Sequence, residues 1–438
     1  MKPLIYQNKT IKNILFLGFG ISNQTCFSFL EKNYSVNAII YDQKKINFKN
    51  PNILRIINDL NLIKNDFQKI DLIITSPGLD LRKNEFSLLS EINIPIINDI
   101  ELFGFLNDRD FQVPIVAITG SNGKSTVTTL VFEMLQAVGI KTAFGGNIGV
   151  GVFDLLNNYS NYDCFVLELS SFQLERIKSL HVTVGAMTNL SKDHLDRYDH
   201  LDVYHQTKLQ LVQLSQYFIC HQNIAHLLKH HENIIYYNLV NNTLRLFIEN
   251  HLNLQGRHNI DNALCAWTII KTFLTKKHIE IINFKEKMIS TLENFKALPS
   301  RCNLIKTNDG LIWIDDSKGT NIDSTKAAIL GLNQNKKNIH LILGGIDKNG
   351  DFSELQTLID QYISHIYLFG KDQLKIKKQI KHQDIYLYKH LDLIIPQIKK
   401  RASKGDLILF SPACASFDQF DNYLHRGRYF KELVLNKR

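Results

Sequence analysis

The stretch Thr119-Gly120-Ser121-Asn122-Gly123-Lys124-Ser125-Thr126 lies between an apolar run and a segment with helical character at residues 127–138. Its glycines allow backbone amides to curl around phosphate oxygens, and Lys124 supplies a positive charge for the terminal phosphates. The hydroxyl of Ser125 is suited to bind Mg²⁺. Ile118 stands where the full phosphate-loop pattern has its first glycine. The strand, loop and helix order predicts binding of ATP or GTP, and a glycine turn that binds no nucleotide is the alternative.

Apolar runs of strand length on either side of this loop predict an α/β protein with parallel sheets. Three such runs end in glycine-bearing loops, at residues 14–20, 115–120 and 339–345. Further candidate strands are residues 38–41, 72–75, 94–97, 164–169, 182–187, 365–369 and 406–410. The runs form three groups, separated near Pro114 and Pro299. We therefore expect three domains, at residues 1–108, 109–297 and 298–438.

The composition is that of a globular protein with several cores. Of 438 residues, 44% are hydrophobic and 21% are charged, which excludes a disordered chain. No apolar run is long enough to span a bilayer, and the N-terminus lacks the pattern of a secretory leader. The six cysteines are scattered without metal-finger spacing, as expected for free thiols in a reducing cytosol. We expect a cytoplasmic protein with no membrane insertion.

The formal net charge of +9 permits nucleic acid, membrane surfaces or anionic small molecules as partners. The basic residues are spread through the chain, and no arginine-rich block stands beside aromatic stacking positions. Net charge alone therefore does not identify a partner.

A second glycine loop, Gly18-Phe19-Gly20-Ile21-Ser22-Asn23, follows the first predicted strand. Asp42 comes about 20 residues later at the end of the next strand, as in dinucleotide-binding folds. Asn23 occupies the position of the third glycine, which normally permits close packing of helix and strand. The loop is suited to present backbone amides to an anion. A nicotinamide or flavin dehydrogenase and a turn that binds nothing both remain open here.

Acidic and polar residues follow two strands of the central group. Glu168 ends the run at 164–169, where a carboxylate is costly to bury without a cation or a hydrogen-bond network. The segment 189–197, Asn-Leu-Ser-Lys-Asp-His-Leu-Asp-Arg, follows the next run. Ligands of open α/β sheets bind at the carboxyl ends of strands, so both segments point towards the phosphate loop. Together they favour phosphoryl transfer assisted by Mg²⁺, whereas either alone fits a helix cap or a surface ion pair.

An ordered set of motifs carries a resemblance to a known family: TGSNGKST (119–126), GGNIG (145–149), LELSSFQLE (167–175), NLSKDHLDRY (189–198), GRHNIDNALCA (256–266) and DDSKGTN (315–321). They are similar to motifs of the Mur ligases, the ATP-dependent amide ligases of peptidoglycan precursor synthesis. SPGLDL (76–81), NDIELF (98–103) and SPACASFDQF (411–420) resemble the branch that adds D-glutamate. The matches cover nearly the whole chain.

The resemblance implies a fold and a reaction. The fold has a Rossmann-like N-terminal domain for the UDP substrate, a central P-loop ATPase-like domain with a mostly parallel sheet, and a Rossmann-like C-terminal domain for the amino acid. ATP phosphorylates the carboxylate of UDP-N-acetylmuramoyl-L-alanine, and the amine of D-glutamate then displaces phosphate. The protein mainly positions reactants and neutralises negative charge. The implied partners are these two substrates, without nucleic acid, and we expect a monomer.

The resemblance also implies the residues that bind ATP and two Mg²⁺ ions. ATP phosphates would be held by Gly120, Ser121, Asn122, Gly123, Lys124, Ser125 and Thr126, and the remainder of ATP by Asn259, Asn262, Arg301 and Asp316. One Mg²⁺ would bind Ser125 and Glu168, and the second His194 and a carbamylated Lys208. A carbamate forms only on a neutral amine, so burial must lower the Lys208 pKa from about 10.4. A solvated helix lysine is the alternative for Lys208.

The remaining implied roles concern catalysis and substrate binding. The implied catalytic residues are Lys124, His194, Lys208, Asp316 and Lys318. D-Glutamate would be bound by Lys318, Thr320, Lys348, Ser416 and Tyr423, and the UDP substrate by Gly18, Gly20, Ile21, Ser22, Asp42, Ser76, Pro77, Gly78, Asn147, Ser170 and His194. Because ATP and D-glutamate belong to different domains, we expect the third domain to swing as a rigid body to complete the site.

Two departures from the family pattern and three alternatives stand beside this interpretation. Tyr423 replaces an expected phenylalanine, and residues 220–254 are shorter than expected and resemble the family poorly. A dehydrogenase would leave the phosphate loop unexplained. Another amide ligase, such as a folate-polyglutamate synthase or a different Mur ligase, would share TGSNGK but lack SPACASFDQF. A nucleic-acid translocase would need basic and aromatic tracking residues.

Overall fold

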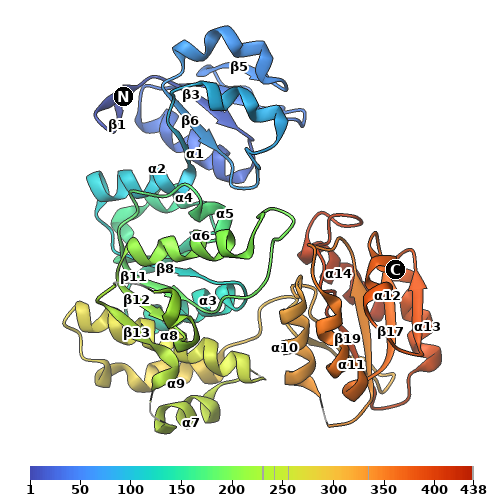
Figure 1. The fold of residues 1–438 in the computed structure, drawn as a ribbon. Coiled ribbons are helices and arrows are strands. Elements are labelled where there is room, and N and C mark those ends of the chain that lie inside the picture. Colours follow the sequence, from blue (N-terminus) through green and yellow to red (C-terminus); the bar gives the residue numbers. More distant parts are fainter. Residues whose placement is uncertain (229–230, 241, 255, 334, 437–438) are drawn as a thin grey trace.

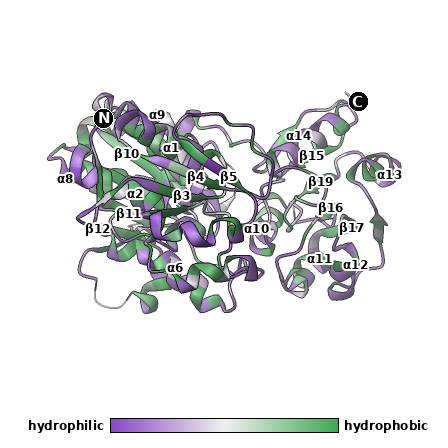
Figure 2. Ribbon diagram, turned by 90° about the horizontal axis from the view of Figure 1, so that it is seen from above, coloured by the Kyte–Doolittle hydropathy of each residue, from purple (hydrophilic) through white to green (hydrophobic). Residues whose placement is uncertain are grey.

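The computed structural model describes residues 1–228, 231–240, 242–254, 256–333 and 335–436. Three α/β domains follow one another along the chain, each built on a largely parallel sheet (Figure 1). Seen from above, the first domain lies over the second, and the third stands to one side (Figure 2). The predicted fold class is confirmed, and each predicted strand overlaps an observed one. No helix in the described part of the chain is both long enough and apolar enough to span a membrane.

The first domain has a five-stranded parallel sheet in the order β5-β4-β3-β6-β7. The strands are β3 (Asn13–Leu17), β4 (Asn37–Tyr41), β5 (Ile53–Ile57), β6 (Leu72–Thr75) and β7 (Ile96–Asn98). A short hairpin precedes them, formed by β1 (Leu4–Tyr6) and β2 (Lys9–Ile11), and the helical segments are α1 (Ile21–Asn33), η1 (Leu60–Lys69) and η2 (Asn84–Glu91). The central strand β3 is almost fully buried, as its continuous apolar run predicts.

The second domain has a six-stranded parallel sheet in the order β13-β12-β11-β8-β10-β9. The strands are β8 (Ile115–Thr119), β9 (Thr142–Gly146), β10 (Cys164–Glu168), β11 (Val182–Met187), β12 (Ser215–Cys220) and β13 (Ile234–Tyr236). The helices are α3 (Lys124–Ala137), α4 (Val152–Asn157), α5 (Ser171–Leu174), α6 (Leu201–Gln213), α7 (Asn242–His251), α8 (Arg257–Lys276) and α9 (Lys285–Asn294), with short turns η3 (Asn107–Phe111), η4 (Tyr159–Asn161), η5 (Gln222–Leu227), η6 (Tyr237–Leu239) and η7 (Ile281–Phe284).

The third domain has a six-stranded sheet in the order β14-β15-β19-β16-β17-β18, in which only the β14–β15 pair is antiparallel. The strands are β14 (Asn303–Ile305), β15 (Ile312–Asp315), β16 (Ile339–Gly344), β17 (Ile363–Phe369), β18 (Ile385–Tyr388) and β19 (Leu407–Phe410). The helical segments are α10 (Ile322–Leu332), η8 (Phe352–Leu355), α11 (Gln356–Tyr362), α12 (Gln373–Gln379), η9 (Leu391–Leu393), α13 (Ile394–Arg401) and α14 (Tyr423–Val434).

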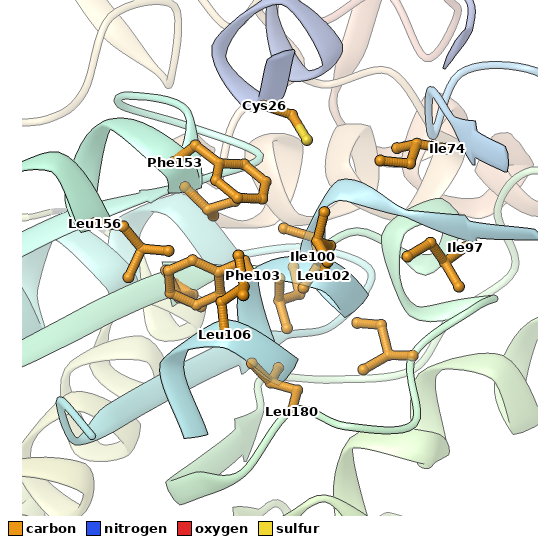
Figure 3. Close-up of a cluster of buried hydrophobic side chains, with 14 of the residues drawn as sticks. Cys26, Ile74, Ile97, Ile100, Leu102, Phe103, Leu106, Phe153, Leu156 and Leu180 are labelled. Atoms are coloured by element: carbon orange, nitrogen blue, oxygen red, sulfur yellow. The ribbon is translucent and has the colours of Figure 1, made fainter. Parts of the chain in front are cut away.

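The first two domains share one hydrophobic core, which runs through helix α2 (Asp99–Leu106). Its buried side chains come from both domains. Figure 3 shows Cys26 and Ile74 of the first domain and Phe153 and Leu180 of the second in the same cluster. Close packing requires glycine at position 104, because a Cβ there would lie 2.8 Å from the Cα of Leu180. The buried core of the third domain is separate. The first two domains therefore form one packed unit.

A buried carboxylate reinforces this joint. Glu101 in α2 is only 1% exposed. Its Oε2 accepts hydrogen bonds from the backbone amides of Lys178 (2.6 Å) and Ser179 (2.8 Å), and its Oε1 accepts from the Tyr6 hydroxyl (2.9 Å). Glu101 thus ties the N-terminal hairpin and α2 to the loop before β11.

Replacing Glu101 with alanine is expected to destabilise the joint between the first two domains. The buried Tyr6 hydroxyl and two partly buried backbone amides would lose their acceptor, and each unsatisfied buried group costs roughly 1–3 kcal/mol. This corresponds to a fall of about 5–10 °C in the unfolding midpoint, measured by differential scanning calorimetry. Glu91→Ala, on the exposed end of η2, is the matched control. Equal midpoints for the two variants would contradict the role of Glu101.

Candidate active site

A cavity of about 720 Å³ lies where the central and C-terminal sheets present the carboxyl ends of their strands to each other. The central domain contributes the loop after β8, Glu168 at the end of β10 and the loop after β11. The third domain contributes the segment after β15, Lys348 after β16 and Ser416 after β19. Open α/β sheets bind ligands at the carboxyl ends of their strands. The ligand-binding ends of two sheets therefore face the same cavity.

The loop after β8 has the geometry of a phosphate cradle. Gly123 has a φ of +80°, and a Cβ there would collide with the side chain of Asn262. The Asn122 amide donates to Asn189 Oδ1 at 2.9 Å. Lys124 Nζ donates to the carbonyls of Gly120 and Ser121, both at 2.9 Å, and burial lowers its pKa. The lysine therefore lies folded against its own loop, within the cavity.

Glu168 lies beside this loop and is 1% exposed. Its Oε1 accepts a hydrogen bond from Asn147 at 2.6 Å, while its buried Oε2 has no partner among the described residues. The Ser125 hydroxyl accepts a hydrogen bond from Arg301 of the third domain at 2.7 Å. Glu168 and Ser125 line the same cavity, and carboxylate and hydroxyl oxygens are ligands of the kind that Mg²⁺ prefers.

Lys208 in α6 is 2% exposed, which excludes the solvated helix lysine. Its Nζ donates to the Gly120 carbonyl at 2.9 Å and lies 5.0 Å from the centre of the Tyr204 ring. Burial lowers the pKa of Lys208 well below its ordinary value, and the nearby Lys124 charge acts in the same direction. Burial thus acts in the direction that a carbamate requires, towards the neutral amine.

His194 lies in the loop after β11, with a left-handed φ of +55°. Its ring contacts Phe172, with ring centres 4.8 Å apart. Burial, together with the positive charge of Lys348, lowers the pKa of His194 to about 3. The imidazole is therefore neutral near pH 7 and able to act as an acceptor or ligand. In the part of the chain that the structure describes, His, Cys, Asp and Glu form no cluster of three or more suited to a metal ion.

Asp193 joins the central and third domains, a role that the sequence interpretation missed. Its Oδ1 lies 2.9 Å from Lys348 Nζ, and its Oδ2 accepts from the Asn321 amide at 3.0 Å. Burial alone would raise its pKa, but Lys348, His194 and Asn321 together hold the pKa well below its usual range. Lys348 Nζ is also 3.4 Å from the hydroxyl of Thr320. Lys348, which lies after the end of β16, is thus paired with the carboxylate of Asp193 within the protein.

Two buried groups of the third domain have strongly shifted pKa values. Burial raises the pKa of Asp316 to about 7, even though its carboxylate accepts hydrogen bonds from Ser411 and the Cys302 amide. Burial and the Arg301 charge lower the pKa of Lys318 to about 7. Lys318 Nζ lies 4.2 Å from the centre of the Tyr423 ring. Perturbed groups of this kind cluster at functional sites.

The far end of the cavity is lined by the start of α8 and by the strand ends of β12 and β13. Asn262 donates to Asn259 at 3.2 Å, and both line the cavity. His221 and Tyr237, which lie in the poorly resembling stretch 220–254, line it as well. Their rings meet edge to face at 5.5 Å, and the Tyr237 hydroxyl donates to the Thr188 carbonyl at 2.6 Å. Their positions after two apolar strands were the signal available in the sequence.

The glycine loop of the first domain lies outside this cavity. The buried Asn23 at the position of the third glycine donates to the Leu17 and Gly18 carbonyls at 3.2 and 2.7 Å. The Asp42 carboxylate accepts from the backbone amides of Phe19 and Lys44, both at 2.8 Å. Asn23 therefore ties α1 to the strand end by a side-chain hydrogen bond where dinucleotide folds use close backbone packing.

A second cavity, of about 340 Å³, lies between the first two domains. Ser76 and Pro77 line it together with three arginines absent from the predicted set: Arg82, Arg176 and Arg197. Arg197 lies 3.0 Å from Glu175 and 4.4 Å from the centre of the Phe172 ring. Phe172 lines both cavities. The two cavities are thus neighbours, and of the three arginines of the second cavity, Arg82 and Arg197 are paired with Asp80 and Glu175, which also line it.

The predicted residues divide between these places. The large cavity is lined by Ser121, Asn122, Gly123, Lys124, Ser125, Thr126, Asn147, Glu168, Ser170, His194, Lys208, Asn259, Asn262, Arg301, Asp316, Lys318, Thr320, Lys348, Ser416 and Tyr423. Gly120 does not line it, but its carbonyl accepts hydrogen bonds from Lys124 and Lys208. Gly18, Gly20, Ile21, Ser22, Asp42 and Gly78 line neither of the two cavities.

Comparison with known proteins identifies the family. Residues 118–247 match the profile of the Mur ligase middle domain, and residues 300–414 match that of the Mur ligase, glutamate ligase domain. The chain is 33% identical to the UDP-N-acetylmuramoylalanine–D-glutamate ligase of Francisella philomiragia, over 99% of both chains. The chain belongs to the Mur ligase family. The Haemophilus ducreyi enzyme of the same name is 36% identical to this Mur ligase, over 98% of both chains.

Solved structures show the same fold at low identity. A pseudomurein peptide ligase type C from Methanothermus fervidus matches this Mur ligase with a TM-score of 0.60 and 18% identity, over 98% of this chain and 100% of that chain. The MurF ligase of Thermotoga maritima, solved in complex with ADP, matches with a TM-score of 0.60 and 14% identity, over 92% of this chain and 96% of that chain. The middle-domain match extends to residue 247, so it includes most of the stretch 220–254 that resembled the family poorly.

Proposed function

We propose that this Mur ligase joins D-glutamate to UDP-N-acetylmuramoyl-L-alanine with conversion of ATP to ADP and phosphate, in peptidoglycan precursor synthesis. One observation carries the proposal: a single cavity is lined by a phosphate loop on one side and by Lys318, Thr320 and Lys348 of another domain on the other. The names of the full-length relatives support the same reaction. The proposed domains are residues 1–108, 109–297 and 298–438, in a cytoplasmic monomer.

ATP would be bound by the loop Gly120–Thr126, with Asn259 and Asn262 on the adenine side. The amides of the loop and Lys124 would neutralise the phosphates. Arg301 and Asp316 would lie near phosphates and ribose. The hydrogen bond from Arg301 to Ser125 supports this assignment, because it brings a cation from the third domain to the phosphate loop.

The site is suited to hold two Mg²⁺ ions, the first at Ser125 and Glu168 and the second at His194 and a carbamylated Lys208. The unpaired Glu168 Oε2 and the neutral His194 support the two sites. The lowered pKa of Lys208 supports the carbamate, which would turn an ammonium into an oxygen ligand. Bound Mg²⁺ would supply positive charge to the phosphate oxygens during transfer.

The amino acid would be bound by Lys318, Thr320, Lys348, Ser416 and Tyr423. D-Glutamate brings two carboxylates, and the two lysines offer charge-assisted hydrogen bonds to them. The UDP substrate would use Gly18, Gly20, Ile21, Ser22, Asp42, Ser76, Pro77 and Gly78, and its muramoyl part would use Asn147, Ser170 and His194. The cavity with Arg82, Arg176 and Arg197 supports an anionic substrate along this path.

The chemistry then follows in two transfers. The γ-phosphoryl group moves from ATP to an oxygen of the alanine carboxylate, and ADP leaves. The D-glutamate nitrogen bonds to the acyl carbon, phosphate departs with that oxygen, and the nitrogen gives up a proton. The chain's own residues position the reactants: Lys124 at the phosphates, and Lys348 and Thr320 at the amino acid. Closure of the third domain would exclude water, which otherwise hydrolyses the acyl phosphate.

The test is phosphate release from ATP with UDP-N-acetylmuramoyl-L-alanine and single amino acids offered in turn. We expect release that requires D-glutamate and fails with L-glutamate or meso-diaminopimelate, because the cations of the third domain bind one stereochemical arrangement of carboxylates. Phosphate release with another amino acid would still fit a Mur ligase, but one that adds a different amino acid. Release stimulated by DNA instead would contradict the proposal.

A further inference from the structure

The positive charge of this Mur ligase is concentrated in one segment. Residues 371–404 contain ten lysines and arginines and three aspartates, a net charge of +7, against +9 for the whole chain. The ten cations are all exposed: Lys371, Lys375, Lys377, Lys378, Lys381, Lys389, Lys399, Lys400, Arg401 and Lys404. The basic residues are spread through the chain, but elsewhere 41 lysines and arginines face 39 acidic residues, so the excess charge outside this segment is only +2.

Six of these cations lie on α12 and α13, and the other four lie in the loops that flank α12, β18 and α13. We call this side of the third domain the basic edge. Strand β18 is the last of its sheet and pairs with β17 on one side. The apolar side chains Ile376, Ile394 and Ile398 are buried, which leaves the lysines of both helices facing outward. In Figures 1 and 2, α13 lies on the side of the domain away from the central domain, whereas α10 faces it. Helix α13 is therefore remote from the large cavity, whereas the first turn of α12 lies nearer to it, because Lys375 pairs with Asp347, whose neighbour Lys348 lines the cavity.

Most of this charge has no anion within the protein. Among the described residues, Lys375 alone of the ten cations is in an ion pair, with Asp347. The acids of the segment do not cancel the remainder: Asp372 accepts from the Asp347 amide, Asp384 accepts from the Tyr386 hydroxyl, and Asp392 is exposed. The remaining lysines repel one another, and this repulsion would be relieved if an external polyanion bound to them.

The exposed leucines that lie between the cations indicate which kind of polyanion would bind there. Leu374 is 62% exposed, Leu393 49% and Leu387 37%. Nucleic acid would favour exposed aromatic rings for base stacking, but Tyr386 is half-buried beneath Arg401 and stacked on Tyr367 at 5.6 Å. Lysines that surround isolated leucines suit anionic lipid headgroups, because the leucines can enter the interfacial layer while the lysines remain at the phosphates.

We propose that the basic edge docks this protein on the anionic surface of a phospholipid bilayer, without insertion of a helix. The large cavity would then stay on the side turned to solvent, open to its substrates. The inference rests on the charge and exposure of residues 371–404 and is independent of the reaction proposed above.

The test is co-sedimentation of the full chain with vesicles of phosphatidylglycerol and phosphatidylcholine in roughly equal amounts. We expect binding that is absent with pure phosphatidylcholine and lost at high salt. Each lysine near such a surface contributes on the order of fivefold in affinity, so Lys377→Gln, Lys378→Gln and Lys400→Gln together should weaken binding at least tenfold. The matched control combines Lys9→Gln, Lys12→Gln and Lys32→Gln, exposed lysines of the first domain, and should stay within about twofold.

A second variant separates lipid from nucleic acid. Leu374→Asn with Leu393→Asn leaves the charge unchanged and should weaken vesicle binding while ligase activity and thermal unfolding stay the same. Binding to single-stranded DNA that is tighter than vesicle binding and unaffected by the leucine changes would overturn the proposal in favour of nucleic acid. Equal binding to neutral vesicles, or an equal loss in the control triple variant, would overturn it outright.

Discussion

Lys208→Ala is expected to lower kcat by a factor of roughly 10²–10³ or more, the cost of losing one preorganised charged group at a phosphoryl-transfer site. The amine is buried, donates to the Gly120 carbonyl at 2.9 Å, and has a pKa well below its ordinary value because of burial. Phosphate release with all three substrates measures the effect. Added short carboxylates such as formate or acetate should restore part of the activity, because they return an anionic oxygen to the vacated space.

Controls separate this role from a structural one. Gln210→Ala changes an exposed residue of the same helix and should leave kcat within about twofold of the parent. The parent enzyme should lose activity when carbon dioxide is removed from the buffer and recover it with bicarbonate, whereas Lys208→Ala should respond to neither. A Lys208→Ala variant with parental activity would contradict both the carbamate and the second metal site.

Lys348→Ala is expected to raise KM for D-glutamate about 10–100-fold, the range for loss of one or two charge-assisted hydrogen bonds. In the structure Lys348 Nζ is held by Asp193 at 2.9 Å and lies 3.4 Å from Thr320. The amine therefore already lies at the meeting point of two domains, where an incoming carboxylate can share it. KM for ATP should change by less than about threefold, because among the described residues the hydrogen bonds and the ion pair of Lys348 go to Asp193 and Thr320 and not to the phosphate loop.

The matched control for this prediction is Lys326→Ala. Lys326 lies in the same domain and forms ion pairs with Asp323 and Glu354; Lys326 itself does not line the large cavity, although Asp323 does. Its loss should leave KM for D-glutamate within about twofold, since Lys326 does not line the cavity and a partly exposed ion pair contributes little. If Lys348→Ala binds D-glutamate as tightly as the parent enzyme, Lys348 acts only as a tether to Asp193.

Some residues of the site can be predicted from their local sequence, whereas others cannot. The phosphate loop and Glu168 were predicted from their places after apolar strands, and the structure has them at the carboxyl ends of β8 and β10. Lys208 was named from the family resemblance alone, since nothing in its helix distinguishes it from a surface lysine. Asp193 was quoted within a motif but received no role, because its partners Lys348 and Asn321 lie 155 and 128 residues further along the chain.

The first domain shows the opposite case. A missing third glycine at Asn23 counted against a dinucleotide site, and the structure supplies the reason: the Asn23 amide bonds the carbonyls at the end of β3. No periodicity or motif predicts such a bond. The hairpin β14–β15 and the arginines of the second cavity were missed for a similar reason, since short strands and scattered cations carry little local signal.

The sequence by itself determined the α/β class, the strands and the loops that follow them, because apolar periodicity and glycine placement act over a few residues. The tertiary structure alone decided that α2 joins two domains into one core, that Arg301 reaches Ser125, and that Lys208 is buried. Burial and the resulting pKa shifts depend on neighbours far along the chain, since desolvation is a property of the packed surroundings rather than of the residue. For the same reason, the sequence shows the run of lysines in residues 371–404, but only the fold shows that all of them are exposed.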